Sequence, residues 1–445
     1  MSLAIAASGC GDPASPGAGT AGGGGHDAAQ AGSATMSQGG ASAGATSGAA
    51  GKAGTSSTNG GGGASSGGQQ STAGMSGDGG ATSFAGASGS GGQSSTGGVP
   101  PVVAAGVRWV GRVDVANAAG PRFAWSGSGF VATVTGDTVA VKLRVEGGED
   151  PIYLQPVVDG VAQPRVSLKS SDADKTLTLG NALSAGDHVV ELYRETEGKS
   201  GYAYCTFLGF ASGTPKAPPA ASGRLIEVIG DSISAGYGNL GSEEHPNGGA
   251  DPSGGCHFTT ETESAYKTYG AVAARAVQAD VSIVAASGWG IYSDNSGNKS
   301  NVLPAVFGNT VGGLATPAWS FAAQPQAVVI NLGTNDFSAD MNLGAAPFSD
   351  AYNAFIATVR GKYPDAVIYC AIGPMLYSTG LTNATKYIKD LVAAQNSAGD
   401  KKVKVLDFGS QDSTKGTGCD YHPNVAEDQR MATLLTQELK TTLGW

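Results

Sequence analysis

The chain has 445 residues, 72 of them glycine, and a formal net charge of −10 at pH 7. Lysine and arginine are not clustered, which excludes nucleic acid as the expected partner, because nucleic-acid binding depends on a concentrated basic face. After the N-terminus, no stretch has the length and apolar purity of a transmembrane helix.

Residues 1–10, Met-Ser-Leu-Ala-Ile-Ala-Ala-Ser-Gly-Cys, are similar to the end of a bacterial lipoprotein signal peptide, in which small residues precede a lipidated cysteine. Cys10 is expected to tether the protein to a membrane; the alternative is an incidental thiol. The next segment, 11–101, consists almost entirely of Gly, Ala, Ser and Thr. Such a segment has nothing to bury, so a disordered linker is expected, and a linker gives an anchored protein reach. An extracellular or cell-surface location follows.

Residues 102–215 are predicted to form an antiparallel β-sandwich of jelly-roll type. Apolar and polar residues alternate there with period two, and Gly, Asp and Ser turns separate the stretches. No amphipathic helix interrupts the stretches, which are 108–114, 130–134, 138–145, 152–158, 188–193 and 204–210. A sandwich of this kind either binds sugars or is a structural accessory domain. Trp125 is likewise either a platform for a sugar ring or part of the sandwich core.

A proline-rich junction, 216–223, precedes a change of period. Residues 224–445 alternate strands with helices, which is typical of a doubly wound parallel α/β sheet. In such a sheet the carboxyl ends of all strands face one crevice, where ligands bind. Strands are predicted at 225–229, 281–285, 327–332, 366–371 and 403–408, and helices at 263–278, 349–362, 383–396 and 425–443.

Polar residues follow four of these strands. Ester hydrolysis needs a nucleophile and a base, and Ser232, after the first strand, and His422, after the last, supply that pair. The reaction also needs donors for the developing oxyanion. The backbone N–H groups of Ser232 and Gly288 and the side-chain amide of Asn335 are predicted to provide them. The blocks are Gly230 to Ser234, Ala286 to Ile291, Asn331 to Asp336 and Gly418 to Asn424.

These four blocks, in this order, resemble those of the SGNH (GDSL-type) hydrolases. The preceding sandwich, with Arg108-Trp-Val-Gly-Arg and Arg122-Phe-Ala-Trp125, resembles the N-terminal domain of family 2 carbohydrate esterases. The resemblance implies a serine esterase that removes O-acetyl groups from plant cell-wall polysaccharides such as xylan or glucomannan. Two alternatives stay open: a GDSL-type lipase or arylesterase for another acyl chain, and a non-catalytic polysaccharide-binding surface protein.

The acid that orients the base departs from the SGNH pattern. Its usual position, three residues before the histidine, is Cys419, and Asp420 lies two before His422. Residues i and i+2 of an extended segment point to the same side, so the Asp420 carboxylate is predicted to reach His422 Nδ1. The alternative is a Ser–His dyad oriented by a backbone carbonyl.

Three aromatic residues near the crevice, Trp289, Tyr292 and Tyr421, are predicted to bind substrate, although packing is the alternative for each. The sequence contains no His/Cys/Asp spacing that demands a metal and no phosphate-binding glycine loop. Cys256 and Cys419 lie in polar loops beside the catalytic blocks and are the preferred disulfide pair. Cys205 and Cys370 lie in apolar stretches and are expected to be buried thiols.

Overall fold

The structure is a computed structural model that describes residues 103–104, 106–198, 202–241, 256–412 and 417–445. All of them belong to one compact unit, Ser90–Trp445. The expectations for a lipid anchor at Cys10 and for a linker over 11–101 lie outside the described residues. None of the helices within these ranges is long and apolar enough to cross a membrane.

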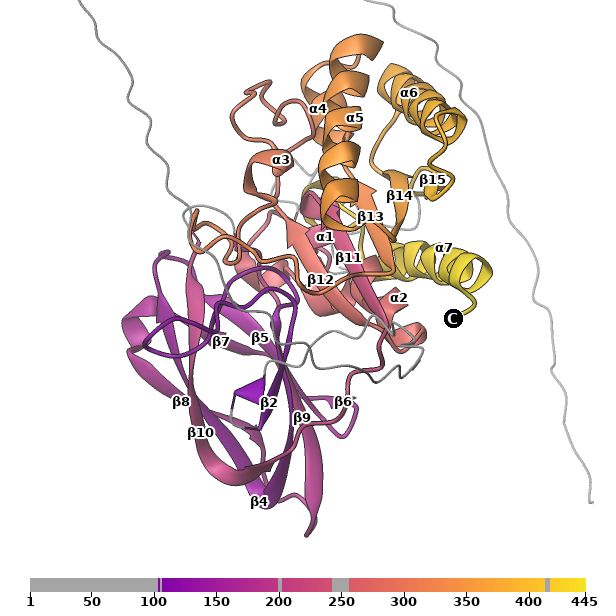
Figure 1. The fold of residues 1–445 in the computed structure, drawn as a ribbon. Coiled ribbons are helices and arrows are strands. Elements are labelled where there is room, and N and C mark those ends of the chain that lie inside the picture. The colour runs from indigo at the N-terminus through magenta and orange to yellow at the C-terminus, as the bar shows by residue number, and fades with distance from the viewer. Residues whose placement is uncertain (1–102, 105, 199–201, 242–255, 413–416) are drawn as a thin grey trace, which may run out of the picture. The chain divides into compact units, whose positions relative to one another are not determined.

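The N-terminal part of the unit is a curled antiparallel sheet of ten strands (Figure 1). Its apolar residues point inward and form a core of their own around Phe123, Phe130 and Leu192. The predicted jelly-roll sandwich is therefore confirmed. The strands are β1 (Val103–Ala104), β2 (Val107–Val110), β3 (Arg122–Phe123), β4 (Gly129–Glu146), β5 (Ile152–Val158), β6 (Val161–Ala162), β7 (Val166–Leu168), β8 (Asp174–Gly180), β9 (Asp187–Arg194) and β10 (Tyr204–Lys216).

Strand β4 differs from the prediction, which placed two strands around a turn at Gly136. The chain instead runs through as one strand of 18 residues. Its first half pairs with β2 and β9, and its second half pairs with β8, while β10 follows both. Gly136 adopts φ 146°, a conformation open to glycine, and so lets the strand bend between the two halves without ending.

The C-terminal part is a parallel sheet of five strands in the order β12-β11-β13-β14-β15, and all four pairings are parallel. The first strand of the sequence, β11, lies inside the sheet between β12 and β13. The order reverses there, and this switch point is where open α/β sheets bind their ligands. The strands are β11 (Leu225–Gly230), β12 (Asp280–Ala285), β13 (Ala327–Asn331), β14 (Val367–Ile372) and β15 (Val403–Asp407).

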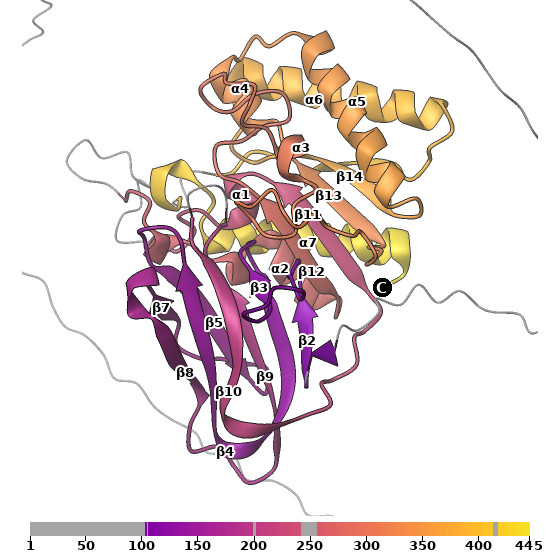
Figure 2. The ribbon, with the colours of Figure 1, turned by 60° about the vertical axis from the view of Figure 1, so that its left-hand side comes forward.

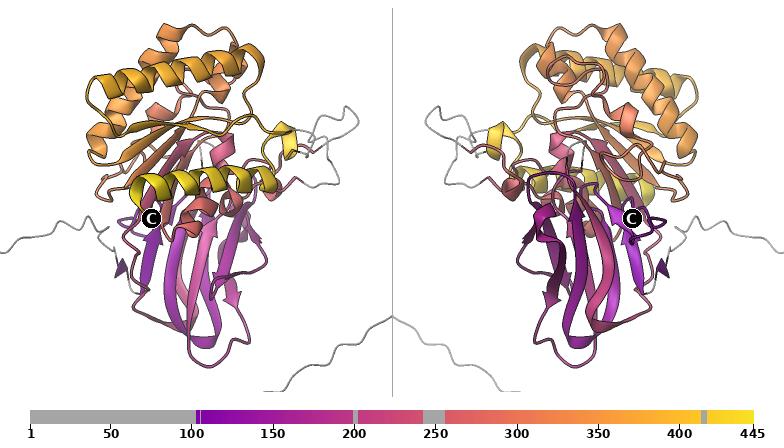
Figure 3. Two further views of the ribbon diagram at one scale, coloured as in Figure 1. Left: turned by 90° about the vertical axis from the view of Figure 1, so that its right-hand side faces the viewer. Right: turned by 90° about the vertical axis from the view of Figure 1, so that its left-hand side faces the viewer.

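Helices cover both faces of this sheet. Figure 3 shows α2 and α7 on one face and α5 and α6 on the other, which is the arrangement of a doubly wound fold. The four long predicted helices are present, although α2 is shorter than expected because a 3₁₀ turn over Ala265–Lys267 replaces its first residues. The helices are α1 (Ser232–Ala235), α2 (Tyr269–Ala276), α3 (Leu303–Val306), α4 (Thr334–Ala339), α5 (Ala345–Lys362), α6 (Ser378–Ser397) and α7 (Val425–Leu443), with a 3₁₀ helix, η5, at Cys419–Tyr421.

A buried ion pair joins the two sheets. The Arg112 guanidinium, which follows β2, lies 2.9 Å from Glu227 Oε1 in β11, and both side chains are almost fully buried. Figure 2 shows β2 close beside β12 at this junction. Trp125 is 1 % exposed and packs in the core of the parallel-sheet domain, and its Nε1 donates to the Asn309 carbonyl at 3.3 Å. It therefore stabilises the junction and is neither a sugar platform nor part of the sandwich core.

Candidate active site

Ser232 lies at the turn from β11 into α1. The preceding residue, Asp231, caps the helix, with its carboxylate accepting the Ile233 N–H at 3.0 Å. Gly230 is required because a Cβ there would lie 2.1 Å from Ser234 Oγ. Ser232 therefore lies at the carboxyl end of β11. It is 5 % exposed, so the residue is largely shielded from solvent.

His422 faces this serine. Its Nε2 lies 2.8 Å from Ser232 Oγ, across 190 residues of sequence. The imidazole is fixed between η5 and α7, where the Gly418 N–H donates to the His422 carbonyl at 2.7 Å and Asn424 caps α7. This is the hydrogen bond that a general base makes to its nucleophile.

The titration of His422 gives a testable pH dependence. Burial lowers the pKa of the imidazole to about 4. The base is then neutral and active above that pH, so kcat/KM is expected to fall in acid with an inflection well below 6.5, the ordinary histidine value. A pH profile on a soluble aryl acetate measures it. The Asp231→Asn variant serves as control, because burial raises the pKa of Asp231 to about 7. An acid limb at 6.5 or above in both proteins would contradict the expectation.

The Asp420 side chain does not face the base. His422 Nδ1 lies 3.0 Å from the main-chain carbonyl of Asp420, so the carbonyl selects the tautomer with the proton on Nδ1. The predicted contact between the carboxylate and His422 is wrong, because it assumed an extended segment. Asp420 adopts φ 49° and ψ 43°, and this left-handed turn directs its side chain elsewhere.

The Asp420 carboxylate instead contacts residues that lie beside His422. It accepts the Phe258 N–H at 2.9 Å and the Tyr237 hydroxyl at 3.0 Å, and it lies 3.0 Å from His257 Nδ1. Partial burial raises the pKa of Asp420. The hydrogen bonds from these three partners together lower the pKa by more than burial raises it, so the net shift is downward. Tyr237 stacks on Phe258 with a centroid distance of 4.0 Å and lies 4.3 Å from the His422 ring.

Tyr237 and Phe258 were not predicted from the sequence. Tyr237 is five residues after the nucleophile, and Phe258 follows Cys256, the cysteine expected to pair beside the base. Their closeness in sequence to Ser232 and Cys256 was the one signal that could have indicated a place in the active site. Neither residue belongs to a motif, and their contact with His422 depends on tertiary packing alone.

The Asp420→Asn substitution distinguishes the two arrangements. Asparagine keeps an acceptor oxygen for Phe258 N–H or Tyr237, and the carbonyl that holds His422 is unchanged, so kcat is expected to fall by less than about tenfold. A carboxylate acting directly on the imidazole would give a loss of roughly 10⁴-fold on this change. Steady-state kinetics and the thermal midpoint are the measurements. A thousandfold loss of kcat with an unchanged midpoint would contradict the carbonyl arrangement.

The three predicted oxyanion donors come from blocks that Asn335 links. Its Nδ2 donates to the Trp289 carbonyl, next to Gly288, at 2.9 Å, and it lies 3.4 Å from Asp231 Oδ2, next to Ser232. Gly288 has φ 81°, a backbone conformation that glycine adopts without strain. The structure thus brings the three segments together, and their role as oxyanion donors is a proposal.

The loop that carries Gly288 is held from two directions. Asp336 is fully buried and accepts the N–H groups of Ile291, Tyr292 and Ser293 at 2.7–3.0 Å. From the sandwich domain, the buried Glu197 carboxylate accepts the Ser287 N–H at 2.8 Å. Glu197 fixes the residue before Gly288, and Asp336 fixes the same loop a few residues after it, so both are candidate positioning residues. Glu197 was not predicted, because nothing in the sequence links the sandwich to this loop.

The predicted substrate-binding aromatics differ in exposure. Trp289 and Tyr292 are partly buried against the core of the domain, and Lys299 Nζ lies 4.5 Å from the Tyr292 ring centroid. Tyr421 is 54 % exposed beside His422. Cys256 and Cys419 are paired in the structure, with Cα atoms 4.6 Å apart, and Cys205 and Cys370 are buried. The described part of the chain holds no group of three or more His, Cys, Asp or Glu side chains able to bind a metal.

A serine and a histidine at the carboxyl edge of a 2-1-3-4-5 parallel sheet define a serine hydrolase of the GDSL class. Comparison with known families agrees: residues 228–429 match the GDSL-like Lipase/Acylhydrolase family, and residues 109–220 match the Carbohydrate esterase 2 N-terminal domain. The chain belongs to the family 2 carbohydrate esterases.

Individual relatives support this assignment. The chain is 36 % identical over 341 residues to cellulase/esterase CelE of Acetivibrio thermocellus, which covers 76 % of this chain and 40 % of that protein. It is 28 % identical to an acetylxylan esterase / glucomannan deacetylase of Cellvibrio japonicus, over 72 % of this chain and 86 % of that one. The solved structure of a family two carbohydrate esterase from Clostridium thermocellum, in complex with cellohexaose, is similar with a TM-score of 0.70 and 36 % identity. That match covers 76 % of this chain and 100 % of the solved one.

Proposed function

We propose that this protein is a serine esterase that removes O-acetyl groups from plant cell-wall polysaccharides such as xylan and glucomannan. The observation that carries the proposal is the 2.8 Å contact between Ser232 Oγ and His422 Nε2 at the switch point of the sheet. The names of the Cellvibrio relatives give the substrate class, and the family gives the reaction type.

The proposed reaction has two halves. His422 Nε2 takes the Ser232 proton while Oγ attacks the acetyl carbonyl, and the Ser232 and Gly288 N–H groups and Asn335 Nδ2 stabilise the oxyanion. His422 then protonates the sugar oxygen as the C–O bond breaks, which leaves acetyl-Ser232. A water, deprotonated by the same imidazole, releases acetate and restores the serine. The Asp420 carbonyl accepts a hydrogen bond from His422 Nδ1–H throughout. The negative end of the carbonyl dipole faces the ring and stabilises the positive charge of the imidazolium.

The choice of acyl chain and of substrate is tested with a panel. Acetate release is measured on acetylated xylan and glucomannan and on N-acetylated chitin oligomers, and p-nitrophenyl esters of acetate, butyrate and octanoate are compared. We expect the O-acetyl polysaccharides and aryl acetate to be hydrolysed and the longer esters and the amide to be poor substrates. Faster hydrolysis of octanoate would assign a lipase instead. Binding of polysaccharide with no hydrolysis of any ester would assign a non-catalytic surface protein.

An exported, surface-tethered location is part of the proposal. Its polymeric substrates lie outside the cell, and a Cys256–Cys419 disulfide would form in an oxidising compartment. Lipidation of Cys10 would supply the tether.

The cysteine pair is expected to be a disulfide in the purified, exported protein. It would close a loop of 163 residues and join the segment of Phe258 to the segment of His422, so reduction should lower both stability and activity. Non-reducing peptide mapping is the measurement, with the Cys256→Ser, Cys419→Ser double variant as a control for reduction. Recovery of both peptides with free thiols would show that the bond is absent.

A further inference from the structure

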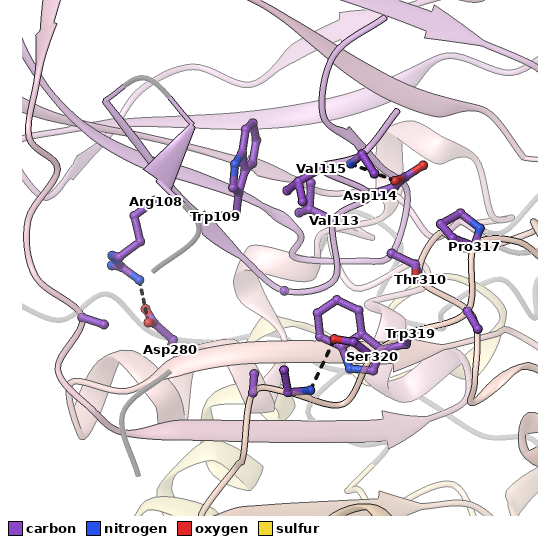
Figure 4. Close-up of a pocket in the computed structure, with 16 residues that line it drawn as sticks. Arg108, Trp109, Val113, Asp114, Val115, Asp280, Thr310, Pro317, Trp319 and Ser320 are labelled. Carbon is purple, nitrogen blue, oxygen red and sulfur yellow. Dashed lines mark hydrogen bonds and ion pairs between the residues drawn. The ribbon is translucent and has the colours of Figure 1, made fainter. Parts of the chain in front are cut away.

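A pocket lies far from Ser232. It has a volume of about 350 Å³ and lies between the sandwich and the start of the parallel sheet (Figure 4). Asp280, which lines it, is the first residue of β12 and pairs with Leu225 at the beginning of β11. Ser232 follows the opposite end of β11, so the pocket and the nucleophile are separated by the length of a strand, about 20 Å.

Two tryptophans form its main apolar surfaces. Trp109 of β2 and Trp319 of the loop before β13 lie on opposite sides of the pocket in Figure 4. The Trp109 ring is fixed by edge contacts to Phe130 and Phe207, with centroids 6.0 and 5.6 Å away. The Trp319 ring lies under the Arg112 guanidinium, 5.4 Å from its centre. Both indoles are therefore held in place before any ligand arrives, which limits the entropy lost on binding.

Polar groups also line this pocket, and their charges include no excess of positive charge. Arg108 is the single cation among the residues that line it, and its guanidinium lies 2.6 Å from Asp280 in a partly exposed ion pair. Asp114, which is 9 % exposed, uses one carboxylate oxygen to accept the Ala116 N–H. Carboxylates and a paired arginine bind hydroxyl groups, whereas an anionic ligand would find no unpaired cation here.

We propose that this pocket is a second, non-catalytic binding site for a neutral sugar ring of a polysaccharide chain. Apolar faces of a pyranose would lie against Trp109 and Trp319, and its hydroxyls would bond to Asp114 and to the Arg108–Asp280 pair. The volume is within the range of pockets that enclose small ligands. The proposal depends on the proposed function for the choice of polymer. A second contact with the same polymer raises the local concentration of acetyl groups near Ser232.

The chain carries five tryptophans, which makes the site directly observable. The full chain is labelled with 5-fluorotryptophan, and each ¹⁹F signal is assigned by a single Trp→Phe change. It is then titrated with unacetylated xylohexaose, mannohexaose and cellohexaose. We expect the Trp109 and Trp319 signals to shift together with one dissociation constant. The signals of Trp125, which is buried, and of Trp445, which does not line the pocket, should stay in place. Trp289, whose carbonyl contacts Asn335, reports separately on the catalytic site.

Variants then test which residues bind. Trp319→Ala is expected to weaken the binding followed at Trp109 by about tenfold, the usual order for truncating a central aromatic contact. Ala318→Phe adds a ring to an exposed lining position and should abolish the shift by filling the pocket. Trp445→Ala is the matched control, because Trp445 also lies beside an arginine, 5.6 Å from Arg224, and should leave the affinity within twofold. Circular dichroism and the thermal midpoint establish that each variant is folded.

Two results would overturn the proposal. One is a response confined to Trp289, and the other is a shift of Trp109 and Trp319 with octanoate but with none of the sugars. Because the titration uses unacetylated sugars, neither result depends on esterase activity. Conversely, a chain that fails to release acetate can still bind sugar at this pocket, so failure of the proposed function is seen separately.

Discussion

Replacing Ser232 with alanine is expected to lower kcat on aryl acetate by roughly 10⁴- to 10⁶-fold, with little change in stability. The hydroxyl is the only group within hydrogen-bonding distance of His422 Nε2 in the described part of the chain. Without it the covalent route is lost, and only binding and oxyanion donors remain. Because the side chain is small, its removal leaves the Asp231 cap and the α1 turn intact.

His422→Ala should produce a loss of similar size, since the hydroxyl is a poor nucleophile without its base. The double variant should be little worse than either single one, because residues that act as a unit are not additive. Single-turnover kinetics and thermal midpoints are the measurements. If the two losses multiply, or if His422→Ala retains a tenth of the activity, Ser232 and His422 do not form one catalytic unit.

Removing the Asn335 amide is expected to have the second largest effect. Asn335→Ala should lower kcat by about 10²- to 10³-fold, as for other side-chain oxyanion donors, while KM changes little. The residue also bonds to the Trp289 carbonyl, so a purely structural role must be distinguished from a direct one. A phosphonate that imitates the tetrahedral intermediate should lose affinity for the variant in parallel with kcat.

Asn295→Ala is the matched control for this change. Its exposed amide lies on the loop that carries Gly288, whereas Asn335 lies in α4, and the Asn295 backbone N–H donates to the Gly288 carbonyl at 2.9 Å. Removing that side chain should change kcat by less than about twofold. Equal losses in the two variants, or a loss at Asn335 that appears in KM alone, would show that the amide holds the loop and does not bind the oxyanion.

The sequence was sufficient for the parts of the site that follow directly from strand ends. Ser232 and His422 could be placed because parallel strands deliver their carboxyl ends to one edge, and the periodic stretches located those ends within one or two residues. Asp420 could not be oriented in this way. Its left-handed backbone is set by packing of the turn around Cys419 and Gly238, whose carbonyl accepts the Cys419 N–H at 2.9 Å.

Contacts between the sandwich and the hydrolase domain were also beyond the sequence. In the sequence, Trp125 is an apolar residue within a strand-rich domain. The structure shows that it packs in the core of the other domain. Glu197 lies in a polar loop after β9, where an exposed side chain is the usual expectation. It is buried because Arg194, also buried, donates to the Thr196 and Glu197 carbonyls and holds that loop against the parallel-sheet domain.

The proposed reaction requires that Ser232 becomes acetylated during turnover on a polysaccharide ester. It is tested most directly by mixing the protein with acetylated glucomannan oligosaccharides, quenching in acid within the first turnovers, and mapping the digested protein by mass spectrometry. We expect one acetyl group on the peptide that contains Ser232 and none on that peptide from Ser232→Ala. Free acetate released at full rate, with no acetyl group on Ser232 at any quench time and undiminished release by Ser232→Ala, would contradict it.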